Sequence, residues 1–433
     1  MGCSDYAREV DMVRPQVPEG VHRQPRLRRT GALLTSLSAL ITTTAVAGPA
    51  VAAGPGGPCD LERTEAHHSE GLDTWNSRYP RPVRELDAAM VFLSFPDARP
   101  RVTPDQLAAD HIPATPDFFR RASYGKFALR VHPLRRWIAM PQRSTAYAIQ
   151  RDWNAKHRAA YLRDAIASAD PHLDFGRYDL VYLVADPHAP GVDADATKVV
   201  NFEKPLRADG VDLRRLVTVF EHHPPDRNVL AHETGHVFDL PDLYHRPKDT
   251  DGNAEWDTYV GDWDLMGSQF GMAPDPFGWH KWKLGWLGPR QVVCDRATGP
   301  RTYTLQPLSA PLKPGRTGAD TRNRLVVVRT GPTTALAIEA RGARGNDSGT
   351  CAQGVLVYRV HNDKASGDGP IQVLDGHPAT SACWNESVYP ELADAPLGVG
   401  DSLSVEEDSV RITVTGRTAD GGWTVRVNRR APT

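Results

Sequence analysis

The chain of 433 residues has little excess charge of either sign. It carries 51 Lys and Arg residues against 53 Asp and Glu residues, which gives a formal net charge of -2 at pH 7. Proteins that bind nucleic acid cluster their Lys and Arg residues, so this balance argues against a nucleic-acid partner. Glycine and proline, with 36 residues each, stay below the share that is typical of a disordered chain. A globular chain of this length can bury a sizeable core without the help of disulfides.

The sequence also lacks the motifs of several other classes of protein. It has no G-x-S-x-G element and no Gly-rich phosphate loop, which leaves a serine hydrolase or a nucleotide-dependent enzyme without support. It has no C-x-x-C pair, which argues against zinc bound by sulfur. After the first 53 residues, no apolar run approaches the ~20 residues that a membrane-spanning helix needs.

The leading 53 residues have the composition of a secretory signal peptide. Four arginines precede an uncharged, mostly apolar segment over residues 31–47, and two small-residue sites lie at its end, Ala45-Val46-Ala47 and Ala50-Val51-Ala52. A basic region, an apolar region and an A-x-A site together indicate export. An uncleaved membrane anchor is the alternative, but Gly48-Pro49 ends the apolar run too early. We therefore expect a secreted protein that has no stable association with a membrane once residues 1–53 are removed.

The rest of the chain divides into segments that differ in composition and in expected secondary structure. Residues 54–85 are polar and irregular, which indicates an N-terminal arm or a short pro-segment. From residue 86 to residue 293, strands alternate with helices. The strands are expected at residues 90–95, 178–185 and 216–220, and the helices after the caps Thr103 and Thr115 and over residues 152–169, with the second helix ending near Gly125.

Residues 294–433 instead contain short β-branched runs separated by Gly, Pro and Asp, with no long helical period. The runs lie at residues 325–328, 336–338, 355–360, 371–374, 410–414 and 423–427. Such a pattern indicates a β-rich domain that is built as a sandwich. The whole chain is therefore expected to have an α+β fold with a β-rich C-terminal domain.

The candidate metal-binding and catalytic motif is H-E-x-x-H, from His232 to His236. Asp226 offers an N-cap, so we expect a helix from about Arg227. Residues four apart on a helix share a face, and both imidazoles can therefore reach one metal ion. Glu233, one residue on, can approach a water molecule at the metal instead of the metal itself. Two His residues with this Glu form the arrangement of zinc peptidases.

The residues that follow offer a third ligand and a Met-turn. The spacing H-E-x-x-H-x-x-D-x-x-D places Asp242 where metzincin peptidases have their third ligand. The chain must turn sharply at Asp239 to bring Asp242 back, and aspartate is one of the few residues other than glycine that tolerates a left-handed conformation. Met266, within the segment from Gly261 to Gly267, matches the Met-turn that underlies the metal in metzincins.

These motifs resemble those of the immune inhibitor A family of secreted bacterial metallopeptidases. The likeness runs from about residue 88 to about residue 415, through the segments His232 to Tyr244, Gly261 to Gly267, Pro276 to Leu287, Phe92 to Asp97, Phe118 to Arg130, Leu336 to Asp347 and Gly354 to Val360. The resemblance implies a metzincin-like zinc peptidase catalytic domain over residues 86–293. Asp239 departs from the family, which usually has glycine at that position.

The expected activity is hydrolysis of peptide bonds in extracellular proteins, so the partners are protein or peptide substrates. One zinc ion held by His232, His236 and Asp242 lowers the pKa of a water molecule to about 7. Glu233 takes a proton from that water as general base and passes it to the leaving amine. Tyr244 is a candidate for assisting the oxyanion, with a packed core tyrosine as the alternative. Two other functions stay open: a zinc hydrolase of a non-peptide amide, and a catalytically inactive zinc-bearing protein that binds surfaces.

Two further groups of residues lie close to the motif. Residues 249–257 alternate oxygen ligands around Gly252, as calcium loops do, with a solvated polar loop as the alternative. A structural calcium ion is therefore a second candidate cofactor. His222, His223 and His245 flank the motif, but their spacing fits no zinc pattern, and we expect them at the surface.

Four cysteines lie beyond the leader. Four cysteines allow three pairings, and an oxidising compartment favours disulfides. Cys351 and Cys383 both lie in the β-rich domain, so we expect them to pair with each other, and Cys59 then pairs with Cys294. The alternative is a latency switch in which the thiolate of Cys59 caps the zinc.

Overall fold

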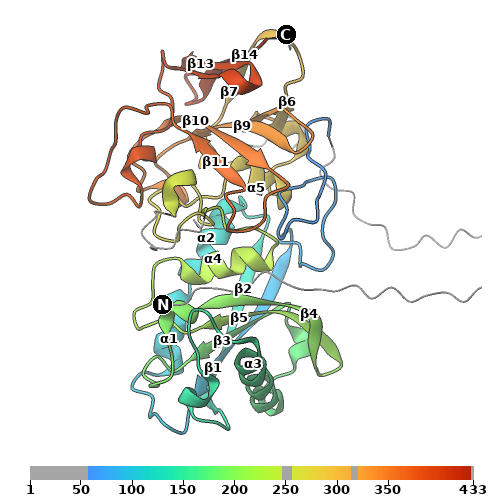
Figure 1. The fold of residues 1–433 in the computed structure, drawn as a ribbon, viewed down its shortest axis with the longest axis vertical. Helices are drawn as coiled ribbons and strands as arrows, with labels where there is room; N and C mark the ends of the chain where they lie inside the picture. The colour runs from blue at the N-terminus through green and yellow to red at the C-terminus, as the bar shows by residue number, and fades with distance from the viewer. Residues whose placement is uncertain (1–56, 246–255, 314–319, 431–433) are drawn as a thin grey trace, which may run out of the picture. The chain divides into compact units, whose positions relative to one another are not determined.

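The computed structural model describes residues 57–245, 256–313 and 320–430, which belong to one structural unit (Figure 1). The fold is mixed α and β, with several sheets and few helices, as the sequence predicts. The expected leader and most of the expected calcium loop, residues 249–255, lie outside the described residues. None of the helices in the described ranges combines the length and the apolar character that crossing a bilayer requires.

Five strands form the first sheet, in the order β2-β1-β3-β5-β4. They are β1 (Glu85–Ser94), β2 (Ala128–Ala139), β3 (Leu180–Ala185), β4 (Lys198–Ala208) and β5 (Val211–Val219). β1 pairs in parallel with β2 and β3, β3 pairs in parallel with β5, and β4 runs antiparallel to β5 at one edge. The expected strands correspond to β1, β3 and β5, whereas β2 and β4 have no counterpart among the sequence-based expectations.

The helices are α1 (Pro104–His111), α2 (Ala114–Ala122), α3 (Ala155–Ala169), α4 (Val229–Val237) and α5 (Gly278–Lys283). Thr103 caps α1 and makes a full capping box, which confirms the first expected helix start. The cap expected at Thr115 is wrong, because this residue lies buried inside α2, and Pro113 occupies the cap position, where its missing N–H is harmless. α3 begins at Ala155, after its cap Asn154, three residues later than its expected start.

Two further sheets lie in the C-terminal part, with strand orders β11-β10-β9-β8-β6 and β12-β13-β14-β7. Their strands are β6 (Val292–Cys294), β7 (Gly299–Leu305), β8 (Leu325–Arg329), β9 (Thr334–Arg341), β10 (Gly354–His361), β11 (Ile371–Leu374), β12 (Ser402–Val405), β13 (Val410–Arg417) and β14 (Trp423–Arg429). The six expected runs correspond to β8, β9, β10, β11, β13 and β14. One buried cluster contains Val326 and Ile338 from the first of these sheets and Ile412 and Val425 from the second. The two sheets therefore face each other as a sandwich.

The largest core cluster extends across the expected boundary at residue 293. It contains side chains of β1, α2, α4 and α5 together with side chains of β9 and β10. Leu61 and Leu72, from the segment that precedes β1, belong to the same cluster. The H-E-x-x-H motif on α4 therefore packs within a core to which the N-terminal arm and the β-rich part both contribute.

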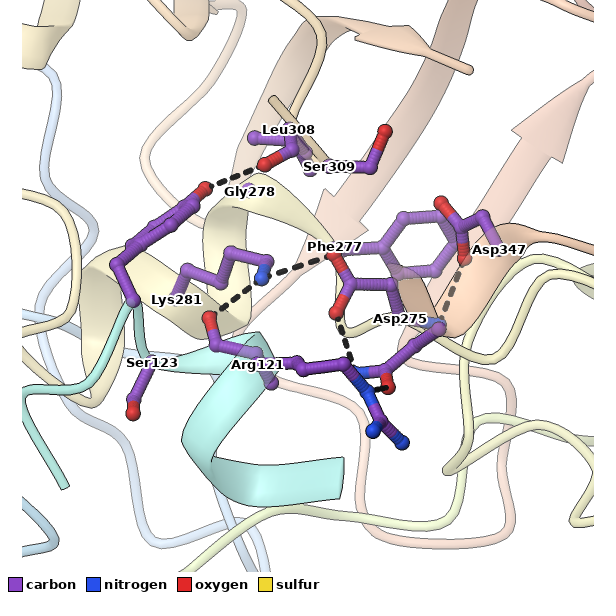
Figure 2. Close-up of polar contacts among 12 residues, drawn as sticks. Arg121, Ser123, Asp275, Phe277, Gly278, Lys281, Leu308, Ser309 and Asp347 are labelled. Carbon is purple, nitrogen blue, oxygen red and sulfur yellow. Dashed lines mark hydrogen bonds and ion pairs between the residues drawn. The ribbon is translucent and has the colours of Figure 1, made fainter. Parts of the chain in front are cut away.

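Buried charges also join the helices to the β-rich part (Figure 2). The Lys281 ammonium on α5 lies 2.9 Å from the Asp275 carboxylate and donates a hydrogen bond to the carbonyl of Ala122 in α2. The backbone N–H of Asp275 donates to Asp347, and Asp347 in turn pairs with the fully buried Arg341 of β9. Removing one member of such a network leaves an uncompensated buried charge, which typically costs about 3–5 kcal/mol.

Two disulfides match the expected pairing. Cys59 pairs with Cys294, with Cα atoms 5.5 Å apart, and Cys351 pairs with Cys383, with Cα atoms 6.2 Å apart. The latency switch is excluded in this state, because the sulfur of Cys59 is bonded to Cys294 and carries no thiolate. The first disulfide attaches the N-terminal arm to β6.

Candidate metal centre

The H-E-x-x-H motif forms α4, whose nine residues are all buried. The rings of His232 and His236 lie one turn apart, with centroids separated by 4.9 Å. The N-cap expected at Asp226 is wrong, because the helix begins after Asn228, which has a left-handed conformation and makes no side-chain capping bond. Asp226 lies two residues too early, and its N–H donates to the Glu221 carboxylate instead.

A sharp turn after α4 brings a third residue back to the two histidines. Asp239 has a φ of +64°, which is the left-handed conformation that the spacing predicts. As a result, one carboxylate oxygen of Asp242 lies 3.2 Å from Nε2 of His232 and 3.1 Å from Nε2 of His236. The three residues proposed from the sequence as metal ligands therefore converge on one point.

Hydrogen bonds on the far side of each ring set the tautomer. Nδ1 of His232 lies 2.9 Å from the carbonyl of Leu265, and Nδ1 of His236 lies 2.8 Å from the carbonyl of Leu240. A carbonyl can only accept, so each Nδ1 carries a hydrogen, and Nε2 is the ring nitrogen of each histidine that a metal ion can bind. The three ligand atoms all lie within 4.8 Å of one another. Such a group could hold a metal ion, and imidazole and carboxylate are among the ligands that zinc accepts.

The electrostatics of the group also favour a cation. Burial alone would lower the pKa of His236, but the Asp242 carboxylate outweighs it and raises this pKa to about 9. Burial alone would raise the pKa of Asp242, but the two imidazoles hold it well below its usual range. The buried carboxylate therefore stabilises positive charge between itself and the rings, which a proton or a metal ion can supply.

Glu233 lies beside this group and does not belong to it. Its Oε2 accepts a hydrogen bond of 2.6 Å from the backbone N–H of Val199 on β4. Burial raises the pKa of the Glu233 carboxyl above its ordinary value. A carboxylate with a raised pKa accepts a proton more readily near neutral pH, which suits a general base.

A cleft of about 490 Å³ opens in front of α4. His232 and Glu233 line it, together with Tyr244 and Trp256, whose rings lie 5.4 Å apart. Tyr244 is half-buried, so it borders the cleft instead of lying wholly in the core. Among the described strands, β4 pairs only with β5, and the N–H of Val199 points from the free edge of β4 toward Glu233.

Met266 lies directly beneath the helix. A methyl group added at Gly235 would overlap the sulfur of Met266, so helix and methionine are in close contact. The Asp264 carboxylate accepts a hydrogen bond from the N–H of Met266 at 2.8 Å. The carbonyl of Met266 accepts one from the N–H of Leu243, next to the third ligand, at 2.9 Å. The methionine therefore lies under the site, as the sequence predicts.

His280 contacts the Met266 turn through Asp264. It is buried between two carboxylates, 2.8 Å from Glu70 and 2.9 Å from Asp264. Burial alone would lower the pKa of His280, but Glu70 and then Asp264 raise it from the ordinary 6.5 to about 9. Between about pH 6.5 and pH 9, the folded protein therefore keeps a proton on His280 that the unfolded chain has already released.

We expect this proton to make folding stability depend on pH. His280 contributes up to about 3 kcal/mol to the free energy of unfolding. This contribution is fully present below about pH 6.5 and is lost as the pH rises through about 9. Urea unfolding of the zinc-loaded protein between pH 6 and pH 10 measures the change. His280→Gln should flatten this part of the profile, and a flat profile in the unchanged protein would contradict the assignment.

The other histidines near the motif do not join the three ligands. His222 is exposed, and His223 pairs with Asp110 at 2.6 Å. His245 is half-buried, with its ring 5.1 Å from that of Tyr259. Of the expected calcium loop, Trp256 and Asp257 are described, and both line the cleft.

Sequence reasoning missed the residues that hold the ligands in place. The Ser366 hydroxyl, from the loop between β10 and β11, donates to the Asp242 carboxylate at 3.0 Å and accepts from the N–H of Asp242 at 2.8 Å. Arg63 and His68, from the N-terminal arm, both contact the Asp239 carboxylate. No motif or spacing marks these residues, because each acts on a segment far away along the chain.

Neither a scan against protein-family models nor a search of the curated proteins returned a match for this chain. The site geometry and the motif therefore carry the functional assignment.

Proposed function

We propose that this chain is a secreted zinc endopeptidase of the kind found in the immune inhibitor A family. The observation that carries the proposal is the convergence of His232, His236 and Asp242 with a fourth residue, Glu233, that borders the same cleft and binds none of them. A purely structural metal site has no use for such a carboxylate. Three protein ligands also leave one tetrahedral position open, which is typical of catalytic zinc and not of structural zinc.

The proposed mechanism divides the work between the metal and the protein. His232, His236 and Asp242 would hold the zinc ion, which would supply Lewis-acid chemistry to a water molecule and to the carbonyl of a peptide bond. Glu233 takes the proton that water loses as it attacks the carbonyl carbon. Glu233 then gives the proton to the nitrogen of the leaving amine, so the residue ends the cycle unprotonated. The N–H of Val199 orients the carboxylate for both transfers.

The edge of the sheet favours an extended peptide as substrate. β4 has a free edge beside Glu233, and an extended chain can add to such an edge through backbone hydrogen bonds. A peptide that lies along β4 would carry its backbone past Glu233 and His232. Backbone recognition of this kind suits the hydrolysis of many different proteins, whereas a small non-peptide amide would not use it.

Casein digestion with and without a chelator tests the proposal. We expect cleavage by the zinc-loaded protein, loss of cleavage after treatment with 1,10-phenanthroline, and recovery when zinc is added back. Cleavage of small amides without cleavage of casein would favour a non-peptide amidase. Binding of zinc with no hydrolysis of either would favour an inactive surface-binding protein.

A further inference from the structure

We propose that the N-terminal arm, residues 57–84, is a permanent part of the metal centre, in which His68 and Arg63 position the turn that presents Asp242. This inference rests on the proposed zinc site, and it goes beyond the proposed activity. It also opposes the reading of this segment as a pro-segment that is removed to release activity.

The contacts of Asp239 carry the first step. Asp239 lies between the helix and the third ligand, in the left-handed conformation, and its side chain is only 1% exposed. One carboxylate oxygen is 2.9 Å from Nδ1 of His68, and the other contacts the guanidinium of Arg63. An ionised carboxylate can only accept, so Nδ1 of His68 donates its hydrogen to Asp239. The ring of His68 also stacks on that of His236, with centroids 5.7 Å apart.

A lysine fixes the backbone of the same turn to the arm. The Lys283 ammonium donates to the carbonyl of Asp239 and to the carbonyl of Ser69, each at 2.8 Å. The turn is therefore held through both its side chain and its main chain. The side chain of Asp239 contacts the arm directly, and its carbonyl is joined to the arm through Lys283.

The arm reaches the metal centre by a second route. Glu70 contacts His280, and His280 contacts Asp264, whose carboxylate accepts the N–H of Met266. The residue before Met266 is Leu265, whose carbonyl sets the tautomer of a ligand histidine. Two chains of contacts thus run from residues 63–70 to the residues that orient the ligands, and Glu70 joins them through Lys283 at 3.6 Å.

The arm is built into the core and not laid over it. Leu61 and Leu72 are buried, and the N–H of Leu72 donates to the carbonyl of Leu61 at 2.8 Å. Cys59 anchors the start of the arm to Cys294. Removing the arm would take both partners from the Asp239 carboxylate and would take Leu61 and Leu72 from the core, and both changes are unfavourable.

The chemistry of aspartate at a left-handed turn explains why an arm would be needed here. Glycine adopts a left-handed turn without help, whereas aspartate brings a carboxylate that must be paired once it is buried. Asp239 and the pair His68 and Arg63 therefore act as a matched set. If so, replacing Asp239 by glycine should remove the need for His68.

The test measures zinc affinity, by competition with a chelator, in protein that circular dichroism shows to be folded. His68→Ala should weaken zinc binding by about 10–100-fold, as is typical when a residue supporting a metal ligand is lost. His68→Asn, whose amide can replace the Nδ1 donor, should restore most of the affinity. Glu65→Ala, an exposed side chain on the same segment, is the matched control and should bind zinc like the unchanged protein. A merely structural role would lower the melting temperature and leave the zinc affinity of folded protein unchanged.

The decisive comparison is made in the Asp239→Gly background. There His68→Ala should have little effect on zinc affinity, and this comparison still decides if His68→Ala alone does not fold. A loss of tenfold or more in that background would overturn the inference, as would His68→Ala with full zinc affinity. So would active protein from the culture medium that lacks residues 57–84 by mass spectrometry. If the zinc results hold but casein is not cleaved, the proposed activity fails and this inference stands.

Discussion

Glu233→Gln is expected to keep zinc at about one ion per chain and to lose nearly all peptide hydrolysis. Glu233 borders the cleft and accepts the N–H of Val199, but it is not one of the three convergent ligands. Glutamine has nearly the same shape and cannot accept the proton from water. A general base typically contributes a factor of about 10²–10⁴ to the rate, so the cleavage rate should fall by a factor of about 10² or more.

Metal analysis after dialysis and cleavage of a fluorogenic peptide measure the two quantities separately. Glu85→Gln is a matched control, because it makes the same chemical change at an exposed residue on β1. It should leave both zinc content and cleavage unchanged. If Glu233→Gln stays active, another group is the base and the mechanism proposed above is wrong.

Asp242→Ala should behave differently, with zinc content and activity falling together. The substitution removes the only anionic member of the ligand group and leaves two neutral imidazoles. It also removes the acceptor of the Ser366 hydroxyl, so the loop between β10 and β11 keeps only its contacts with the backbone of residue 242. Zinc binding should weaken strongly, because a site with two protein ligands no longer meets the coordination that zinc requires.

The same metal analysis decides this prediction, with chelator competition to give the affinity. Asp242→Asn is the informative partner, since it keeps the size of the side chain and removes its charge. Full zinc content in Asp242→Ala would show that the third ligand lies elsewhere. From the sequence, Asp239 and His245 would be the next candidates, but the carboxylate of Asp239 is already paired with Arg63 and His68. His245 would then be the first residue to test.

Local features of this chain were predictable from its sequence. The spacing of His232 and His236 depends only on the repeat of a helix, and the turn at Asp239 depends only on the backbone that this residue tolerates. The short β-branched runs of the C-terminal part predicted six of its strands for the same reason, since each run can be recognised within a few residues. The pairing of four cysteines followed from which part of the chain each one occupies.

Two strands of the first sheet could not be predicted in this way. β2 and β4 lie at the two edges of the sheet, and each contains a proline, Pro133 and Pro205. Edge strands carry charged residues and proline because one side of their backbone needs no partner. Their sequences therefore lack the apolar pattern of the central strands, although β4 borders the candidate site.

The sequence by itself thus determined which residues can be metal ligands and where six strands of the C-terminal part lie. Only the tertiary structure decided what holds those ligands. Ser366 is 124 residues from Asp242, and His68 is 171 residues from Asp239. The physical reason is that hydrogen bonds and ion pairs act over a few ångströms in space and leave no spacing along the chain. A helix repeats every 3.6 residues, but the partner of a buried carboxylate can come from any segment that the fold brings alongside.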